Sequence, residues 1–304
     1  MAELVQTPVR RAAPQWRPAT RSRLSAAGTA GSPRLRAWVS GGVLAVLVGA
    51  ALVVPMVAQL DQQFVDLAAA NRPPQLAHPF GTDELGRDVL LRCIYGLRIS
   101  LAVGLLAAVV SSVVGTAVGA LAGVAGGWTD RLLMRVVDGV AAVPHLLLGI
   151  VIVAILGPSL SSVVASIALT HWLSSARIVR SEVLTLRGRP FVDAAVLGGS
   201  SRRRIMARHL LPNVAPQVLL TTTLMVPHAI WHETALSFLG LGLPAHTASI
   251  GNMLGDASRS LLLGYWWMSA APGLVFVLAT LAVAGLGGVW RDRLNPQRRS
   301  ELSW

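Results

Sequence analysis

Long apolar runs separated by short polar segments dominate this chain of 304 residues. A helix needs about 20 apolar residues to cross the hydrocarbon core of a membrane, which is roughly 30 Å thick. Several runs have this character, and we interpret them as membrane spans. They lie near residues 38–58, 98–125, 136–157, 160–180, 213–241 and 268–290. The pattern therefore predicts an all-α polytopic membrane protein with six transmembrane helices.

The remaining segments complete a predicted domain organisation. Residues 1–37 are rich in Arg, Pro, Ala and Ser and have little to bury, so we expect a disordered basic cytoplasmic leader. This leader is too long for the charged region of a cleaved signal peptide, and residues 38–58 are expected to remain as the first transmembrane helix. We expect an extracytoplasmic segment at 59–97, a five-helix core at 98–290 containing a cytoplasmic loop at 181–212, and a cytoplasmic tail at 291–304.

Charge placement predicts the orientation of these spans. The formal net charge is +12, and all 26 basic residues are Arg. The Arg residues flank the apolar runs and do not form one face, which favours membrane lipid over nucleic acid as the partner. Loops that alternate along the chain are Arg-rich, so both termini are predicted to be cytoplasmic in a multi-pass membrane protein. The segment 59–97 does not follow this alternation, because it is predicted to lie outside yet carries Arg together with Asp and Glu.

The residue types that are missing exclude several kinds of chemistry. Without Lys, the chain has no phosphate-binding Walker lysine and no Schiff-base lysine. The single cysteine, Cys93, excludes an intrachain disulfide and a cysteine-based zinc site. We therefore expect no catalytic residue and no cofactor or metal bound by this chain, with any use of ATP and Mg left to a partner ATPase.

Polar and small residues inside the apolar runs are the candidates for function. Small residues repeat every four positions at Gly115, Gly119 and Gly123, which predicts close packing of that helix against a neighbour. Four hydroxyl residues share the same spacing in the fourth span, and they either line an aqueous path or form hydrogen bonds between helices. This hydroxyl stripe consists of Ser162, Ser166, Thr170 and Ser174.

A second polar group lies in the fifth span. His228 and His232 share one helix face at a spacing that metal ligands also use, and Glu233 follows directly. A charged group in mid-bilayer costs at least about 2.5 kcal/mol, so Glu233 should face protein or water. These three residues are expected either to contact a substrate or metal in an aqueous path or to form a buried polar network. Bends are expected at Pro144, Pro216 and Pro227.

The loop between the fourth and fifth spans carries the most specific motif. It consists of an acid and two alanines, three residues, a glycine, nine residues, and a segment that ends in proline. The residues are Asp193, Ala194, Ala195, Gly199, His209, Leu211 and Pro212. An acid near a helix start suits the helix dipole, Gly permits the turn that ends a short helix, and Pro suits the start of the next helix.

This spacing resembles the "EAA" loop of ABC-transporter permeases, with Asp193 in place of Glu and His209 in place of Ile. Further matches lie at 78–88, at Gly126-Gly127-Trp128, at 236–242 and at 291–296. From about residue 75 to 296 the chain resembles the inner-membrane permeases of dipeptide, oligopeptide and nickel ABC importers.

The resemblance implies the type I ABC importer permease fold. It also implies a second homologous permease subunit, two ABC ATPase subunits that dock on the 193–212 loop, and an extracytoplasmic solute-binding protein. We expect half of a translocation path for peptides, with a nickel or metallophore permease of the same family as the alternative. An ion-coupled secondary transporter should show internal repeats, and none is evident in the sequence. An intramembrane enzyme would need catalytic residues, and the group at 228–233 is the only candidate.

Overall fold

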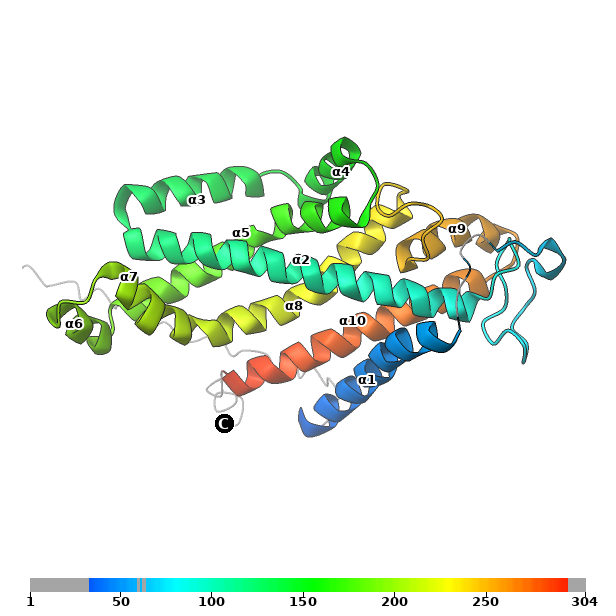
Figure 1. Cartoon of the computed structure of the whole chain (residues 1–304), viewed down its shortest axis with the longest axis horizontal. Coiled ribbons are helices and arrows are strands. Elements are labelled where there is room, and N and C mark those ends of the chain that lie inside the picture. Colours follow the sequence, from blue (N-terminus) through cyan, green and yellow to red (C-terminus); the bar gives the residue numbers. More distant parts are fainter. Residues whose placement is uncertain (1–32, 59–60, 62–63, 295–304) are drawn as a thin grey trace, which may run out of the picture.

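The computed structural model describes residues 33–58, 61 and 64–294 as an elongated bundle of helices (Figure 1). Most of the leader predicted to be disordered, residues 1–32, lies outside the described part, as do the last residues of the predicted tail. The prediction is wrong for residues 33–37, which form the start of the first helix, where Pro33 suits the first helical position. The helices are α1 (Pro33–Val57), η1 (Leu67–Ala69), α2 (Val89–Ala125), α3 (Gly127–Ala141), α4 (His145–Leu156), α5 (Leu160–Arg187), α6 (Pro190–Leu197), α7 (Arg202–Ile205), η2 (Met206–Leu210), α8 (Leu211–Phe238), α9 (Ile250–Leu262) and α10 (Trp267–Leu294).

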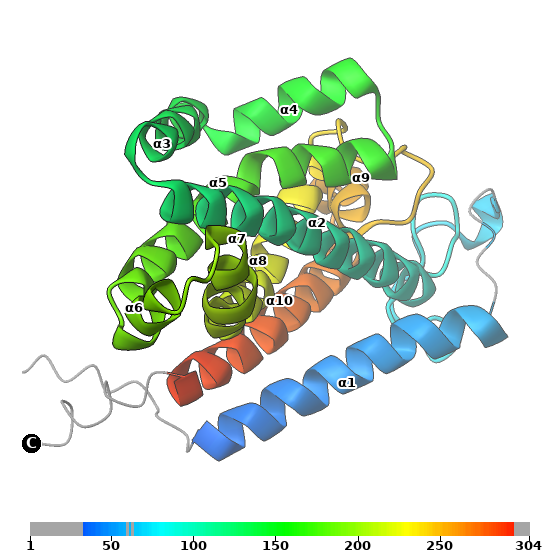
Figure 2. The same ribbon diagram turned by 60° about the vertical axis from the view of Figure 1, so that its left-hand side comes forward.

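The long helices form three groups that lie side by side. Helices α2, α5 and α8 occupy the centre and pack on one another. Helices α1 and α10 pair on one flank, while α3 and α4 lie against α5 on the other (Figure 2). The short helices α6 and α7 lie at one end of the bundle, and α9 and residues 64–88 lie at the opposite end (Figure 1).

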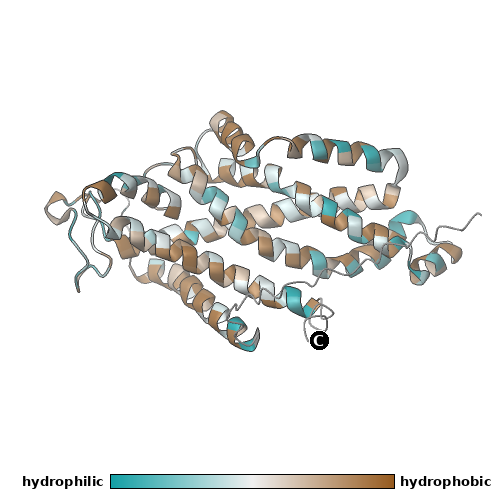
Figure 3. Cartoon of the chain, turned by 180° about the vertical axis from the view of Figure 1, so that it is seen from behind, coloured by the Kyte–Doolittle hydropathy of each residue, from teal (hydrophilic) through white to brown (hydrophobic). Residues whose placement is uncertain are grey.

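Helices α1, α2, α5 and α10 are long and apolar enough to cross a membrane, and Figure 3 shows apolar residues along much of their length. The bent pair α3 and α4 counts as a fifth candidate if it forms one span. Helix α8 has 28 residues and packs between α2, α5 and α10, but polar side chains interrupt its apolar sequence and it is not among these candidates. The predicted all-α polytopic fold is therefore confirmed, and the count of six spans stays a prediction.

The predicted span 136–157 is not one straight helix. Helices α3 and α4 meet at 84° across the turn 142–144. Pro144 lacks a backbone N–H and disfavours helical geometry at the preceding residue, which explains why α3 ends and a new helix starts. Helix α4 has only 12 residues, about 18 Å at 1.5 Å per residue, and is too short to cross a membrane alone. The bend expected at Pro144 is confirmed, whereas α8 continues through both Pro216 and Pro227.

Close packing of α2 on α5 follows from the glycine stripe. A Cβ atom added to Gly115 would lie 2.5 Å from Ser175 Cβ, and one added to Gly123 would lie 2.6 Å from Val183 Cγ1. At Gly119 it would collide with the carbonyl oxygen of Ala176. The backbones therefore approach as closely as the repeat predicts.

Helix α2 starts nine residues before the predicted span. Asp88 caps it, because its carboxylate accepts a hydrogen bond from the backbone N–H of Leu91 at 2.8 Å. The preceding loop is held by Asp83, which pairs with Arg87 at 2.8 Å and with the buried Arg92 at 2.5 Å. The predicted extracytoplasmic segment 59–97 thus contains an ordered, ion-paired loop followed by the first turns of α2.

Candidate functional site

A cavity of about 910 Å³ lies between the α3–α4 turn, α5, α8 and the end of α10. Along α8 it extends from Gln217 to His228, about 17 Å at 1.5 Å per residue. Its polar lining includes Arg177 on α5 and Asp292 on α10 beside the apolar residues of α3 and α8. The cavity therefore runs from the end of the bundle where α8 begins toward its middle.

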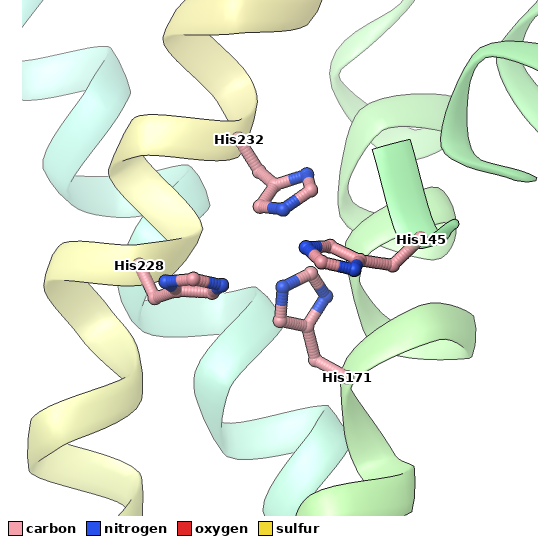
Figure 4. Close-up of side chains that lie close together, drawn as sticks. All are labelled: His145, His171, His228 and His232. Atoms are coloured by element: carbon pink, nitrogen blue, oxygen red, sulfur yellow. The ribbon is translucent and has the colours of Figure 1, made fainter. Parts of the chain in front are cut away.

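Four histidines gather at the inner end of this cavity (Figure 4). His145 is the first residue of α4, His171 lies on α5, and His228 and His232 lie one turn apart on α8. Their possible ligand atoms all lie within 4.8 Å of one another. His171 and His232 are buried, whereas His145 and His228 are exposed. His145, His171 and His228 line the cavity, and His232 completes the group behind them.

Sequence reasoning found only half of this cluster. The pair at 228 and 232 stands out by its spacing, and His171 is visible only as a neighbour of the hydroxyl stripe. His145 has no local signal apart from its position after Pro144, which starts α4. A pattern search within single helices misses the group because its members come from three different helices.

The hydroxyl stripe on α5 mainly forms hydrogen bonds. Ser166 Oγ donates to the carbonyl oxygen of Gly149 on α4 at 3.1 Å, which joins the two helices. Ser162 Oγ lies 2.7 Å from Ser159 Oγ at the start of α5. Thr170 Oγ1 donates to the carbonyl oxygen of Ser166 at 2.9 Å, and Ser174 Oγ donates to that of His171 at 3.1 Å. Of the four hydroxyl residues, Thr170 and Ser174 line the cavity.

Glu233 lies apart from the histidines although it follows His232 in the chain. Its side chain is fully buried and accepts hydrogen bonds from Ser100 on α2 at 2.6 Å and from Ser237 on α8 at 2.9 Å. Ser237 also accepts a bond from the backbone N–H of Leu243. The carboxylate therefore belongs to a polar network between α2, α8 and the following loop. Within the described chain it does not line the large cavity.

The motif loop folds into α6, α7 and the π-helical turn η2. Helix α6 begins at Pro190, so Asp193 lies in its first turn as the dipole argument requires. Gly199 has φ +74°, a conformation that favours glycine, and it turns the chain after α6. Pro212 lies in the first turn of α8, and the ring of His209 lies 6.5 Å from that of Phe191 on α6.

One face of this loop packs on the bundle and another is exposed. Val192, Ile205 and Leu210 are buried in a cluster with residues of α5 and α8. Ala195 packs partly against the same cluster, whereas Asp193 and Ala194 are exposed. Large apolar side chains also point away from the bundle: Phe191 is 41% exposed, Val196 57% and Leu197 89%. Exposed apolar side chains grouped on a rigid element are typical of a surface that binds another protein.

The chain matches the family model of the binding-protein-dependent transport system inner membrane component over residues 115–300. It belongs to this family. It is 37% identical over 233 residues to the dipeptide transport system permease protein DppC of Bacillus subtilis, covering 77% of this chain and 73% of that protein. It is 36% identical over 257 residues to the oligopeptide transport system permease protein OppC of the same organism, covering 84% of each chain. It is 39% identical over 261 residues to a probable peptide ABC transporter permease of Sinorhizobium fredii, covering 86% and 89%.

Family membership confirms the resemblance seen in the sequence. As an inner membrane component of a binding-protein-dependent system, the chain is a multi-pass permease subunit and not an ion-coupled secondary transporter. Membership of this family identifies the chain as a transport subunit, which argues against the intramembrane enzyme. A binding protein is by definition part of the system that such a permease serves.

Proposed function

We propose that this permease forms half of the translocation path of a peptide importer and couples to a separate ABC ATPase through the loop 193–212. Relatives that align with most of the chain are named for dipeptides, oligopeptides or peptides, which favours peptides over nickel or a metallophore. A second homologous permease would supply the other half of the path, two ATPase subunits would use ATP and Mg, and a solute-binding protein would deliver the peptide.

The observation that carries this proposal is the exposed apolar surface of α6 at the end of the bundle toward which the cavity runs. A short helix held to α5 and α8 by a buried cluster moves with them as one body. Movement of an ATPase subunit bound to α6 would therefore be transmitted to the helices that line the cavity.

The same arrangement supports the orientation and the count of six spans. The turn between α2 and α3 and helices α6 and α7 lie at one end of the bundle, and α1 begins and α10 ends on the same side, nearer the middle (Figures 1 and 2). Arg residues gather there, as expected for the cytoplasmic side. We infer that both termini are cytoplasmic, that the α3–α4 pair and α8 complete six spans, and that α9 and residues 64–88 face outward.

Uptake of a radiolabelled dipeptide and tripeptide by cells that depend on this permease tests the proposal. Ala194→Glu should reduce ATP-dependent uptake to background, because a charge placed in a closely packed protein cleft is desolvated without a partner. Gly199→Pro should do the same, because proline cannot adopt the positive φ at this position.

Matched substitutions at the same positions serve as controls. Ala194→Ser keeps a small side chain, and Gly199→Asn keeps access to the left-handed conformation, so both should retain most of the uptake. Membrane levels of all four proteins are compared by immunoblot. Unchanged uptake in Ala194→Glu and Gly199→Pro at equal protein level would show that the loop is not the coupling site. Absence of peptide uptake by the wild-type system would reject the substrate class.

A further inference from the structure

We propose that His145, His171, His228 and His232 form a binding site for one divalent transition-metal ion of the class that prefers imidazole ligands, such as Zn²⁺. The site is a property of this chain alone. It does not depend on which solute the permease carries.

The spacing of the rings fits a tetrahedral ion. With Zn–N bonds of about 2.0–2.1 Å, four imidazoles around one ion have ring centroids about 5 Å apart. The pairs made by His145 are separated by 5.6, 5.9 and 4.8 Å. The other three pairs are separated by 5.2, 4.5 and 5.3 Å. All six distances thus scatter around the value that a single central ion requires.

The ring orientations agree with these distances. Figure 4 shows the four rings converging from three helices, each with a nitrogen turned toward the space between them. A tetrahedral site places its nitrogens about 3.4 Å apart, while the ligand atoms here lie within 4.8 Å, so the widest pair must close by at most about 1.4 Å. Small rotations about side-chain bonds achieve this without moving a helix, and the two exposed histidines have room to make them.

Hydrogen bonding prepares His171 to be a ligand. Its Nδ1 lies 3.0 Å from the carbonyl oxygen of Ile167, and a carbonyl can only accept, so Nδ1 carries the proton. Thr170 Oγ1, 2.8 Å away, donates its own hydrogen to a backbone carbonyl and so can accept from Nδ1 as well. Nε2 is then unprotonated, with a free lone pair. Metal-bound histidines commonly donate their other N–H to a backbone carbonyl in this way.

Two buried ring nitrogens lack the partners that buried polar atoms need. In the described part of the chain, Nε2 of His171 and Nε2 of His232 have no hydrogen-bond partner. An unsatisfied buried polar atom destabilises a fold, and here two occur in one cluster. An ion bound between the rings would give both nitrogens a partner at once. The cluster is therefore better explained as a ligand set than as packed aromatic rings.

The position of the cluster provides an entry route and a mechanical consequence. An ion can reach His145 and His228 from the cavity that these residues line, and then engage the buried pair behind them. The bound ion would join the start of α4 to α5 and α8. Because α4 follows a sharp bend at Pro144, this link would hold α4 at its angle to α3 beside the cavity that His145 lines.

Metal binding by the purified full-length chain, together with the subunits that copurify with it, tests the proposal. The protein carries an affinity tag other than polyhistidine, is stripped with a chelator, incubated with Zn²⁺ or Co²⁺, and desalted. Metal per chain is counted by inductively coupled plasma mass spectrometry, and the visible spectrum of the Co²⁺ form reports the geometry. We expect one retained ion per chain and the intense absorption of tetrahedral Co²⁺.

Variants of the exposed ligands separate loss of binding from loss of folding. His145→Gln and His228→Gln change exposed side chains, and each should weaken metal binding by about tenfold or more. His246→Gln changes an exposed histidine outside the cluster and should bind as the wild type does. Equal metal retention by the wild type and the two cluster variants would overturn the proposal, as would a wild type that retains none. Neither result bears on peptide uptake, so the uptake experiment tests the proposed function independently of this site.

Discussion

At the residue scale, His232 and Glu233 are neighbours in the chain with different environments. The ring of His232 points to the histidine cluster, whereas the carboxylate of Glu233 points to Ser100 and Ser237. Consecutive residues of a helix face directions about 100° apart, so one can approach the path while the next packs against α2. The charge that the sequence places in the membrane thus has hydroxyl partners inside the protein, as its cost in lipid requires.

Substitutions of Glu233 distinguish a network role from a role in the path. Glu233→Leu leaves two buried hydroxyls without their acceptor and should lower the free energy of unfolding by about 1–3 kcal/mol. Glu233→Gln keeps an acceptor oxygen and should retain both stability and uptake. Thermal unfolding of the detergent-purified protein is measured beside peptide uptake. A Glu233→Gln protein with wild-type stability but no uptake would place the residue in transport itself.

At the element scale, the contact between α2 and α5 depends on the absence of side chains. The three glycines of α2 bring its backbone against residues 172–183 of α5, which also carries the hydroxyl stripe and His171. Without a hydrophobic driving force between helices in lipid, this close van der Waals packing is a main source of association. The position of His171 relative to α8 therefore depends on a contact made by a different pair of helices.

Gly119→Ala tests this dependence with a single methyl group. The added Cβ would collide with the backbone oxygen of Ala176, so the helices must separate, at a cost of about 1–3 kcal/mol. Gly42→Ala on α1 is the matched control, because a Cβ there meets nothing within 4 Å. We expect a lower melting temperature for Gly119→Ala only. Equal melting temperatures would show that α2 and α5 can separate without cost.

At the scale of the whole molecule, the two ends of the bundle differ in chemistry. One end carries α6, α7 and the Arg-rich turns, and the other carries α9 and the ion-paired loop around Asp83 (Figure 1). The large cavity runs toward the α6 end, while a smaller cavity of about 470 Å³ lies between the Asp83 loop and α9. A molecule with this asymmetry has one predicted orientation in the membrane.

Cysteine labelling of intact cells measures that orientation. Val196→Cys on α6 and Leu76→Cys in the opposite loop are both exposed, and the native Cys93 is buried. A membrane-impermeant maleimide should label Leu76→Cys in intact cells and Val196→Cys only after the membrane is opened. Labelling of Val196→Cys from outside would reverse the topology and remove α6 from the reach of a cytoplasmic ATPase.

The sequence by itself determined the class of the molecule and its family. Apolar runs, Arg-rich turns and the spacing from Asp193 to Pro212 are local features, and each can be recognised without knowing how helices pack. The bend at Pro144 and the close approach along the glycine stripe were predictable for the same reason, because backbone sterics act within a few residues. The exact limits of α2 were not predictable, since the cap at Asp88 lies in a polar segment outside the apolar run.

Only the tertiary structure decided which polar residues meet. His145, His171 and the pair on α8 are far apart in the chain, and their convergence depends on the 84° bend, on the α2–α5 contact and on the placement of α8 together. The separation of Glu233 from the cavity is likewise set by how α8 is rotated against α2. Helix periodicity gives the relative directions of side chains on one helix, but the rotation of each helix in the bundle is fixed by packing with all its neighbours.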